Sequence, residues 1–263
     1  MIVTTSYEPD QEMILRAINI ARQVGGQFIE RGKFSLLELN KSYNTKETIV
    51  IEKELTKYYS TETENPFFFH PSMATLRINR LKQGDNDIMV DISKLKLGDT
   101  FLDCTLGLAS DSIVASFVVG STGKVVGIES QPIISAIVQD GLNQGWPKDK
   151  DIDQAMKRIE VLTKHYLPTL KIFPSKSFDV VYFDPMFRQG QRKSSSMNPL
   201  RKLANAEPIQ VEAIEEAKRV AKRMVILKEH IYSREFERLG FTPIHRSSSI
   251  TYGIINVNGD EQK

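Results

Sequence analysis

The stretch Thr100-Phe101-Leu102-Asp103-Cys104-Thr105-Leu106-Gly107-Leu108-Ala109-Ser110-Asp111 decides the fold of this chain. An apolar segment of strand length ends in an acidic residue, a glycine follows, and polar residues open the next segment. This order is typical of a buried strand that turns directly into a helix. Gly107 permits a tight turn that brings the backbone close to a ligand, and Ser110 or Asp111 is expected to cap the helix.

The same alternation of strands and helices continues to the end of the chain. The expected strands are 100–104, 124–129, 158–162, 179–183, 224–228, 242–246 and 250–257. The expected helices between them are 110–119, 131–142, 208–223 and 233–239. Repeated strand–helix–strand units predict parallel strands with helices on both faces. We therefore expect an α/β fold with a doubly wound, mostly parallel, Rossmann-like sheet of seven strands.

The first 65 residues are expected to form a small α/β domain of their own. The pattern predicts strands at 2–5 and 27–30, helices at 10–24 and 34–39, and a hairpin of 48–51 with 57–60. A polar stretch follows at 61–66, so we expect domains at 1–65 and 66–263. Phe67, Phe68 and Phe69 are hard to hide on one face of any element, and packing is their expected role. A helix is expected from Met73.

Composition excludes several classes of protein. The chain has 263 residues, a net charge of +2 and 40% hydrophobic residues, so any nucleic-acid binding must come from a local patch. Cys104 is the single cysteine, which excludes an intrachain disulfide and a cysteine-based zinc site, and no metal site is expected. The sequence shows no signal peptide and no apolar run long enough for a membrane span. We expect a cytoplasmic protein with no membrane partner. The sequence does not indicate its oligomeric state.

The loop after the first parallel strand predicts the kind of cofactor. In doubly wound sheets, ligands bind beyond the carboxyl ends of the strands. Thr105 and Ala109 stand where a dinucleotide loop has glycines, which disfavours a dinucleotide. Asp103 and Asp111 lie on either side of Gly107 and suit a smaller ligand with a positive centre and an amino-acid tail. S-adenosylmethionine has both features; the alternative is a strand–turn–helix that holds no ligand.

Acidic and aromatic residues also follow the next two strands. Glu129 ends the second strand, where a carboxylate can accept both hydroxyl groups of a ribose. It can equally interact with the dipole of the helix that begins near Gln131. His165 and Tyr166 follow the third strand, near the expected place of an adenine. His165 can stack on the adenine or hydrogen-bond to it, or be an ordinary polar loop residue.

The segment Phe178–Phe187 predicts the chemistry. An apolar strand runs into Asp184-Pro185-Met186-Phe187. The carboxylate of Asp184 and the backbone carbonyl of Pro185 can accept the N–H groups of an exocyclic base amine, which favours a pyramidal nitrogen whose lone pair points at a methyl group. Phe187 can stack on the base. The alternative is a plain turn or helix start.

A basic segment follows directly. Residues 185–206 carry five basic side chains and no acidic one, which favours a phosphate backbone as partner over a merely solvated surface. Arg77 and Arg80 are candidates to extend this patch. The predicted RNA-binding residues are Arg188, Arg192, Lys193, Arg201 and Lys202.

Three segments carry a resemblance to a known family. These are Asp103–Asp111, Ile128–Ser130 with Asp140–Leu142, and Tyr182–Phe187 with Arg192–Ser194. They resemble the bacterial small-subunit ribosomal RNA guanine-N2 methyltransferases, which are class I S-adenosylmethionine-dependent enzymes. The resemblance implies cofactor contacts at Ser110, Asp111, Glu129, Ser130, His165, Tyr166 and Asp184.

The leading hypothesis is therefore a methyltransferase for a base amine of RNA, with guanine N2 of ribosomal RNA as the expected target. An adenine-N6 or small-molecule methyltransferase stays open, because the same strand tip can hold any planar amine. A non-catalytic RNA-binding protein that keeps the fold also stays open. A nicotinamide-dependent oxidoreductase is disfavoured by the loop without glycine repeats.

Overall fold

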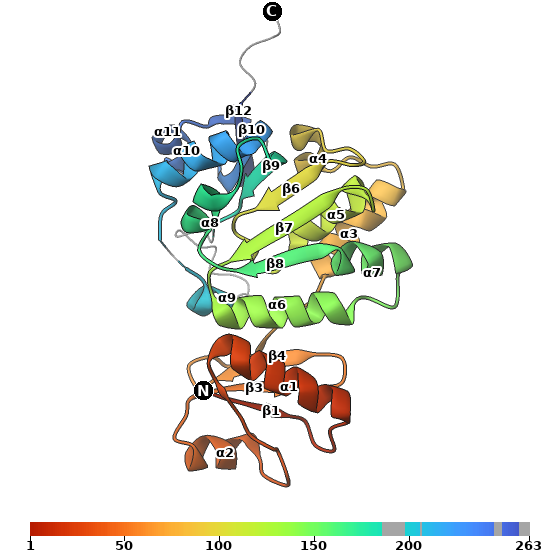
Figure 1. The fold of residues 1–263 in the computed structure, drawn as a ribbon, viewed down its shortest axis with the longest axis vertical. Helices are drawn as coiled ribbons and strands as arrows, with labels where there is room; N and C mark the ends of the chain where they lie inside the picture. The colour runs from red at the N-terminus through yellow and green to blue at the C-terminus, as the bar shows by residue number, and fades with distance from the viewer. Residues whose placement is uncertain (186–197, 206, 245–248, 258–263) are drawn as a thin grey trace, which may run out of the picture. The chain divides into compact units, whose positions relative to one another are not determined.

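The computed structural model describes residues 1–185, 198–205, 207–244 and 249–257 (Figure 1). Contacts between Cα atoms divide the chain into two compact units. The first unit takes residues 1–70, 131–144 and 191–204, and the second takes 71–130, 145–190 and 205–263. The expected domain boundary between residues 65 and 66 stays a prediction, because compactness does not test whether either part folds alone.

A five-stranded sheet forms the centre of the first unit, in the order β2-β1-β3-β4-β5. β1 pairs in parallel with β2 and β3, whereas β4 pairs antiparallel with β3 and β5. The expected small α/β unit and its hairpin are thereby confirmed. The strands are β1 Ile2–Thr5, β2 Gln27–Phe28, β3 Glu47–Ile51, β4 Thr56–Ser60 and β5 Phe67–Phe68.

Among its described residues, the first unit also has four helices: α1 Gln11–Val24, α2 Leu36–Ser42, α6 Pro132–Gln144 and α9 Asn198–Leu203. α6 packs on α1 and β4. A buried ion pair joins α1 to α6, with Arg16 Nη2 2.8 Å from Asp140 Oδ2, and Thr56 donates to the same oxygen. Gly141 lies against the ring of Phe69, and a Cβ atom at position 141 would be only 2.2 Å from Cδ1 of that ring. Phe69 therefore packs within this unit, as expected.

The second unit contains a seven-stranded sheet in the order β11-β12-β10-β9-β6-β7-β8. β12 pairs antiparallel with β10 and β11, and the other neighbouring pairs are parallel. The predicted doubly wound, mostly parallel sheet is confirmed. Its strands are β6 Thr100–Asp103, β7 Lys124–Glu129, β8 Ile159–Thr163, β9 Phe178–Phe183, β10 Ala221–His230, β11 Thr242–Ile244 and β12 Ile250–Asn256.

Helices cover both faces of this sheet (Figure 1). Val181 and Phe183 of β9 point into a core shared with α8 Tyr166–Ile172, α10 Val211–Val220 and α11 Glu235–Leu239. Tyr182 lies between them in sequence and so points to the opposite face, where its hydroxyl reaches Asp111 of α5. The helices packed around α5 Ser110–Val119 are α3 Ser72–Lys82, α4 Ile88–Ser93 and α7 Lys150–Lys157.

The helix expected over 208–223 is too long at its carboxyl end. α10 stops at Val220, and β10 begins at Ala221, which pairs with Phe178 of β9. Pairing with a buried strand outweighs a helical pattern that continues past this point. The sequence did not predict α4, α7, α8 and α9, which have six to eight residues each; helices of this length give only a weak periodic signal.

Within the described residues, no helix combines the length and the apolar character needed to cross a bilayer.

Candidate active site at the carboxyl ends of the parallel strands

The loop that follows β6 forms backbone hydrogen bonds to both neighbouring strands, β9 and β7. The backbone N–H of Cys104 donates to the carbonyl of Tyr182 at 2.8 Å, and that of Leu106 donates to the carbonyl of Ile128 at 2.9 Å. Gly107 then takes a left-handed φ of +49°, which costs a glycine little. The loop is thereby held close above the carboxyl ends of β9 and β7.

The first turn of α5 differs from the expectation. Its N-cap is Ala109, in a left-handed conformation with φ +57°, and no side chain caps the helix. The predicted capping by Ser110 or Asp111 is therefore wrong. Asp111 instead turns into the protein, where Arg77 and Lys228 hold its carboxylate at 2.5 Å and 2.9 Å.

Asp103 supports the loop from beneath. Its side chain accepts a hydrogen bond from the Ser112 hydroxyl at 2.7 Å and from the Thr105 backbone N–H at 3.0 Å. The residue is only 2% exposed. This burial raises the pKa of Asp103 to about 7, against an ordinary value near 4.

Asp103→Asn is expected to gain stability relative to the wild type as the pH rises. The folded state raises the pKa of Asp103, so the wild type loses stability between pH 4 and pH 7, whereas asparagine does not titrate. The difference in unfolding free energy should grow by on the order of 2 kcal/mol from pH 5 to pH 8. Urea unfolding at several pH values measures it.

Asp179→Asn is the matched control for this experiment. Asp179 accepts hydrogen bonds from the backbone and hydroxyl of Thr100, which outweigh its burial and lower its pKa. Its carboxylate stabilises the fold above the ordinary pKa of an aspartate, so the variant should be less stable at every pH from 5 to 8. A difference for Asp103→Asn that stays constant across that range would contradict the assigned burial.

Glu129 ends β7 and lies beside the same loop. Its Oε2 atom accepts a hydrogen bond from the Gly107 backbone N–H at 3.1 Å. The residue is largely buried, and it is in register with Thr163 of the neighbouring strand β8. Ser130 follows directly in the chain. A carboxylate thus stands at the carboxyl edge of the sheet, as the sequence predicts.

His165 has a structural role that accounts for its position. It is the N-cap of α8, and its Nδ1 atom accepts the backbone N–H of Leu167 at 3.3 Å. Its ring lies 4.4 Å, centroid to centroid, from that of Tyr166. Tyr166 is buried, with its ring edge-on to Phe183. Contact of either ring with an adenine stays a prediction.

Asp184 follows β9 and is held at two points. Its backbone N–H donates to the Thr105 hydroxyl at 2.6 Å, and its Oδ2 atom accepts from Nζ of Lys228 at 2.7 Å. Burial raises the pKa of Asp184 to about 6, although the Lys228 ammonium group opposes this rise. The strand tip therefore presents a fixed carboxylate that is ionised at neutral pH.

These features occur in a chain with clear relatives. Residues 37–240 match the family described as "Putative SAM-dependent methyltransferase". The chain belongs to this family of S-adenosylmethionine-dependent methyltransferases. S-adenosylmethionine is its cofactor.

Relatives of this methyltransferase differ in how much of it they match. The uncharacterized protein YpiP of Bacillus subtilis (strain 168) is 39% identical over 258 residues, which are 98% of this chain and 100% of YpiP. "Ribosomal RNA small subunit methyltransferase J" of Buchnera aphidicola subsp. Schizaphis graminum (strain Sg) is 34% identical over 135 residues, 50% of this chain and 53% of that protein. The protein of that name from Coxiella burnetii (strain Dugway 5J108-111) is 32% identical, with 51% of each chain covered. The chain thus spans about half the length of the relatives with that name.

A solved structure supports the fold. The SAM-dependent methyltransferase NGO1261 of Neisseria gonorrhoeae superposes with a TM-score of 0.69 over 99% of this chain and 98% of its own. The two sequences are 13% identical, so this likeness shows the fold alone.

Two basic residues of the methyltransferase, Lys228 and Arg77, differ from what its sequence predicts. Lys228 ends the apolar run of β10, and that position was its only sequence signal. The proposed extension of the basic patch to Arg77 is wrong, because its guanidinium group pairs with Asp87 at 2.7 Å and with Asp111 at 2.5 Å. Arg80 pairs with exposed Asp85 at 3.2 Å.

Phe187, Arg188, Arg192 and Lys193 lie outside the described residues, as does the side chain of Arg201.

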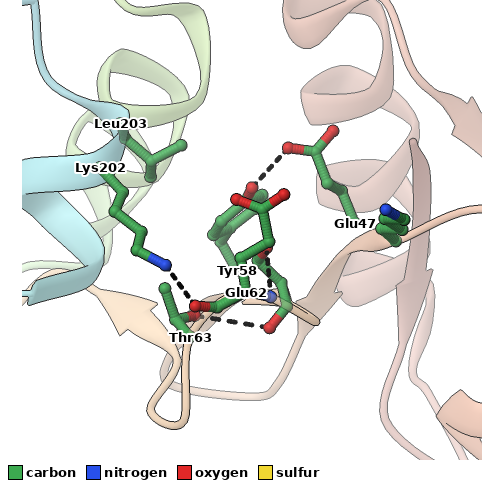
Figure 2. A pocket seen from close by; sticks show the side chains of 8 residues that line it. Glu47, Tyr58, Glu62, Thr63, Lys202 and Leu203 are labelled. Atoms are coloured by element: carbon green, nitrogen blue, oxygen red, sulfur yellow. Dashed lines mark hydrogen bonds between the residues drawn. The ribbon is translucent and has the colours of Figure 1, made fainter.

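Lys202 lies in the first compact unit of the methyltransferase, where it lines a hollow of about 250 Å³ (Figure 2). Its ammonium group donates to the backbone carbonyl of Glu62, while the Tyr58 hydroxyl donates to Glu47 at 2.6 Å. The lining includes two lysines, Lys46 and Lys202, and the two glutamates. This balance gives the hollow no clear preference for a polyanion, so RNA binding by Lys202 stays a prediction.

Proposed function

We propose that this methyltransferase modifies an exocyclic amine of an RNA base, with guanine N2 of small-subunit ribosomal RNA as the target. The observation that carries the proposal is the Asp184 carboxylate, fixed at the end of β9 by Thr105 and Lys228. The relatives named as ribosomal RNA small subunit methyltransferase J support the choice of RNA. An RNA substrate of this kind would place the protein in the cytoplasm.

Asp184 and Pro185 would act by orientation. Bound S-adenosylmethionine supplies an electrophilic methyl group on a sulfonium sulfur, which leaves as a neutral thioether. The Asp184 carboxylate and the Pro185 carbonyl would accept the two N–H groups of the base amine, so that the nitrogen lone pair faces the methyl carbon. The nitrogen gives up one proton as it gains the methyl group, and the Asp184 carboxylate is an available acceptor. Phe187 would stack on the base.

The residues around the loop fit the cofactor. Glu129 offers the acceptor that ribose hydroxyl groups require, and the turn at Gly107 brings backbone N–H groups close to the same place. The carboxylate of Glu129 also suits a ligand with a positive sulfonium centre. Asp103 and Asp111 are buried and would act indirectly, Asp103 through the backbone of Thr105 and Asp111 through the side chain of Lys228. Further proposed cofactor contacts are Ser110, Ser130, His165 and Tyr166.

One assay tests this function. The purified protein is incubated with methyl-labelled S-adenosylmethionine and small ribosomal subunits from cells that lack the gene, and the RNA is digested to nucleosides. Label in N2-methylguanosine is the expected result. Label in N6-methyladenosine would instead identify adenine as the target base. Cofactor binding without label in RNA would overturn the RNA assignment.

Neutralising Arg192 and Lys193 is expected to weaken RNA binding more at low salt than at high salt. Each lost phosphate contact lowers the salt slope, so Arg192→Gln with Lys193→Gln should reduce the slope of log K against log salt by about 1.4 for single-stranded RNA. Fluorescence anisotropy with a labelled single-stranded RNA measures the slope.

The matched control is Lys94→Gln with Lys96→Gln. These exposed lysines precede β6, at the amino edge of the sheet, where ligands do not bind. Their removal should leave the slope unchanged. An equal loss of affinity at all salt concentrations for the Arg192 and Lys193 variant would contradict the proposed phosphate contacts.

A further inference from the structure

Lys228 contacts two carboxylates at once. Its Nζ atom is 2.7 Å from Oδ2 of Asp184 and 2.9 Å from Oδ2 of Asp111. Leu227 is in register with Phe183 on the parallel strand β9, so the next residues on the two strands lie side by side. Burial alone would lower the pKa of Lys228, but the two carboxylates raise it well above its usual value. The ammonium group therefore stays protonated.

Asp111 is held from its other side as well. Arg77 donates to its Oδ1 atom at 2.5 Å, and the Tyr182 hydroxyl donates to its Oδ2 atom at 3.0 Å. Arg77 also pairs with Asp87. Opposite charges thus alternate along an ion row that consists of Asp87, Arg77, Asp111, Lys228 and Asp184.

From Asp111 outward, the ion row becomes more exposed toward the strand tip. The side chain of Asp111 is 6% exposed, that of Lys228 is 20% exposed, and that of Asp184 is 26% exposed. Buried ion pairs lose much of their attraction to desolvation, and apolar side chains of similar size often stabilise a fold equally well. Unlike an apolar cluster, a row of charges can fix the position of a carboxylate at its exposed end, which here is Asp184.

We propose that Lys228 is a positioning residue for methyl transfer, which holds Oδ2 of Asp184 so that this carboxylate stays ionised and keeps one orientation toward the substrate amine. The inference rests on the proposed role of Asp184. Lys228 would act through Asp184 and would not itself contact the substrate. The other titratable groups that act on Asp184 from the described elements are Asp111 on α5, Asp103 on β6, Tyr182 on β9 and Tyr252 on β12.

Three variants isolate the effect. Lys228→Met removes the charge and keeps an unbranched side chain, whereas Lys228→Arg keeps the charge. Lys222→Met is the matched control. Lys222 lies on the same strand as Lys228, and its Nζ atom pairs with Asp179 of β9 at 3.3 Å, near the opposite end of the two strands. Methylation of small ribosomal subunits from cells that lack the gene gives kcat and KM between pH 5.5 and pH 8.5.

For Lys228→Met we expect kcat at pH 7 to fall by about 100-fold. The KM for S-adenosylmethionine should stay within about threefold, because on this proposal the ammonium group acts on Asp184 and not on the cofactor. The acid limb of the pH profile should move up by about one unit, since the carboxylate has lost its cation. Lys228→Arg should restore at least part of kcat, and Lys222→Met should match the wild type. An unchanged kcat and an unmoved acid limb in Lys228→Met would overturn the proposal.

Two further measurements keep the test decisive. Carbon-13 NMR of the free protein, with Asp184→Asn as the assignment standard, follows the titration of the Asp184 carboxyl group without any substrate. It should show the same upward shift in Lys228→Met; no shift would overturn the inference even if ribosomal subunits prove not to be the substrate. The double variant Lys228→Met with Asp111→Asn removes one charge of each sign. A return to wild-type kcat in this variant would mean that Lys228 only compensates Asp111, which also overturns the proposal.

Discussion

Asp184→Asn is expected to lower the kcat of methyl transfer by about a thousandfold or more. Asparagine has the size of aspartate, but it exchanges a carboxylate oxygen for an N–H donor. The amide has one acceptor oxygen where the carboxylate has two, so it cannot accept from Lys228, which lies 2.7 Å from Oδ2 of Asp184, and also hold an N–H group of the amine through its second atom. A neutral amide also does not accept the proton that the amine gives up. Single-turnover methylation of small ribosomal subunits measures the loss.

The control for this prediction lies on the same strand. Asp179 lies near the amino end of β9 and pairs with Thr100 and Lys222, so Asp179→Asn should keep a wild-type kcat. Calorimetry should give both variants a dissociation constant for S-adenosylmethionine within about threefold of the wild type. Full activity of Asp184→Asn would refute the mechanism, while loss of cofactor binding would move Asp184 from the substrate to the cofactor.

Glu129→Gln is expected to raise the dissociation constant of S-adenosylmethionine by about 100-fold. The carboxylate would accept hydrogen bonds from both hydroxyl groups of the ribose, and hydrogen bonds to a charged group are the stronger kind. Glutamine keeps one acceptor and replaces the other with a donor, which also weakens the bond from the Gly107 N–H. Isothermal titration calorimetry of the purified protein measures the change directly.

Glu160→Gln provides the comparison. Glu160 lies on the neighbouring strand β8, where it is exposed and pairs with Lys124 at 2.9 Å, so the variant should bind the cofactor as the wild type does. The thermal stabilisation by S-adenosylmethionine should shrink in Glu129→Gln and persist in Glu160→Gln. Equal affinities for the two variants would remove Glu129 from the cofactor site.

The sequence predicted the second unit well because its strands are short apolar runs that end in recognisable residues. Asp103 and Glu129 close β6 and β7, and Asp184 directly follows β9. Parallel strands bring their carboxyl ends to one edge of the sheet, so the order of elements alone placed these carboxylates together. The end of α10 was harder to predict, since Ala221 fits a helix as well as it fits the strand that pairs with Phe178.

The ion row shows what a linear pattern cannot reveal. Lys228 and Asp184 are 44 residues apart in the chain, and they meet only because β10 lies next to β9 in the sheet. Arg77 meets Asp111 across 34 residues. Apart from the position of Lys228 at the end of an apolar run, the sequence does not distinguish Lys228 or Arg77 from a solvated charge. The sequence could therefore identify the carboxylates and not the cations that hold them.

The first compact unit is built from segments that lie far apart in the sequence, and this constrains how the newly made chain can fold on the ribosome. Arg16 is synthesised more than a hundred residues before Asp140, its buried partner on α6. Until α6 emerges, the faces of α1 and β4 that it covers stay bare. The amino-terminal segment therefore stays incompletely packed while β6 and β7 of the second sheet are being translated. Maturation of the two units is therefore interleaved in time.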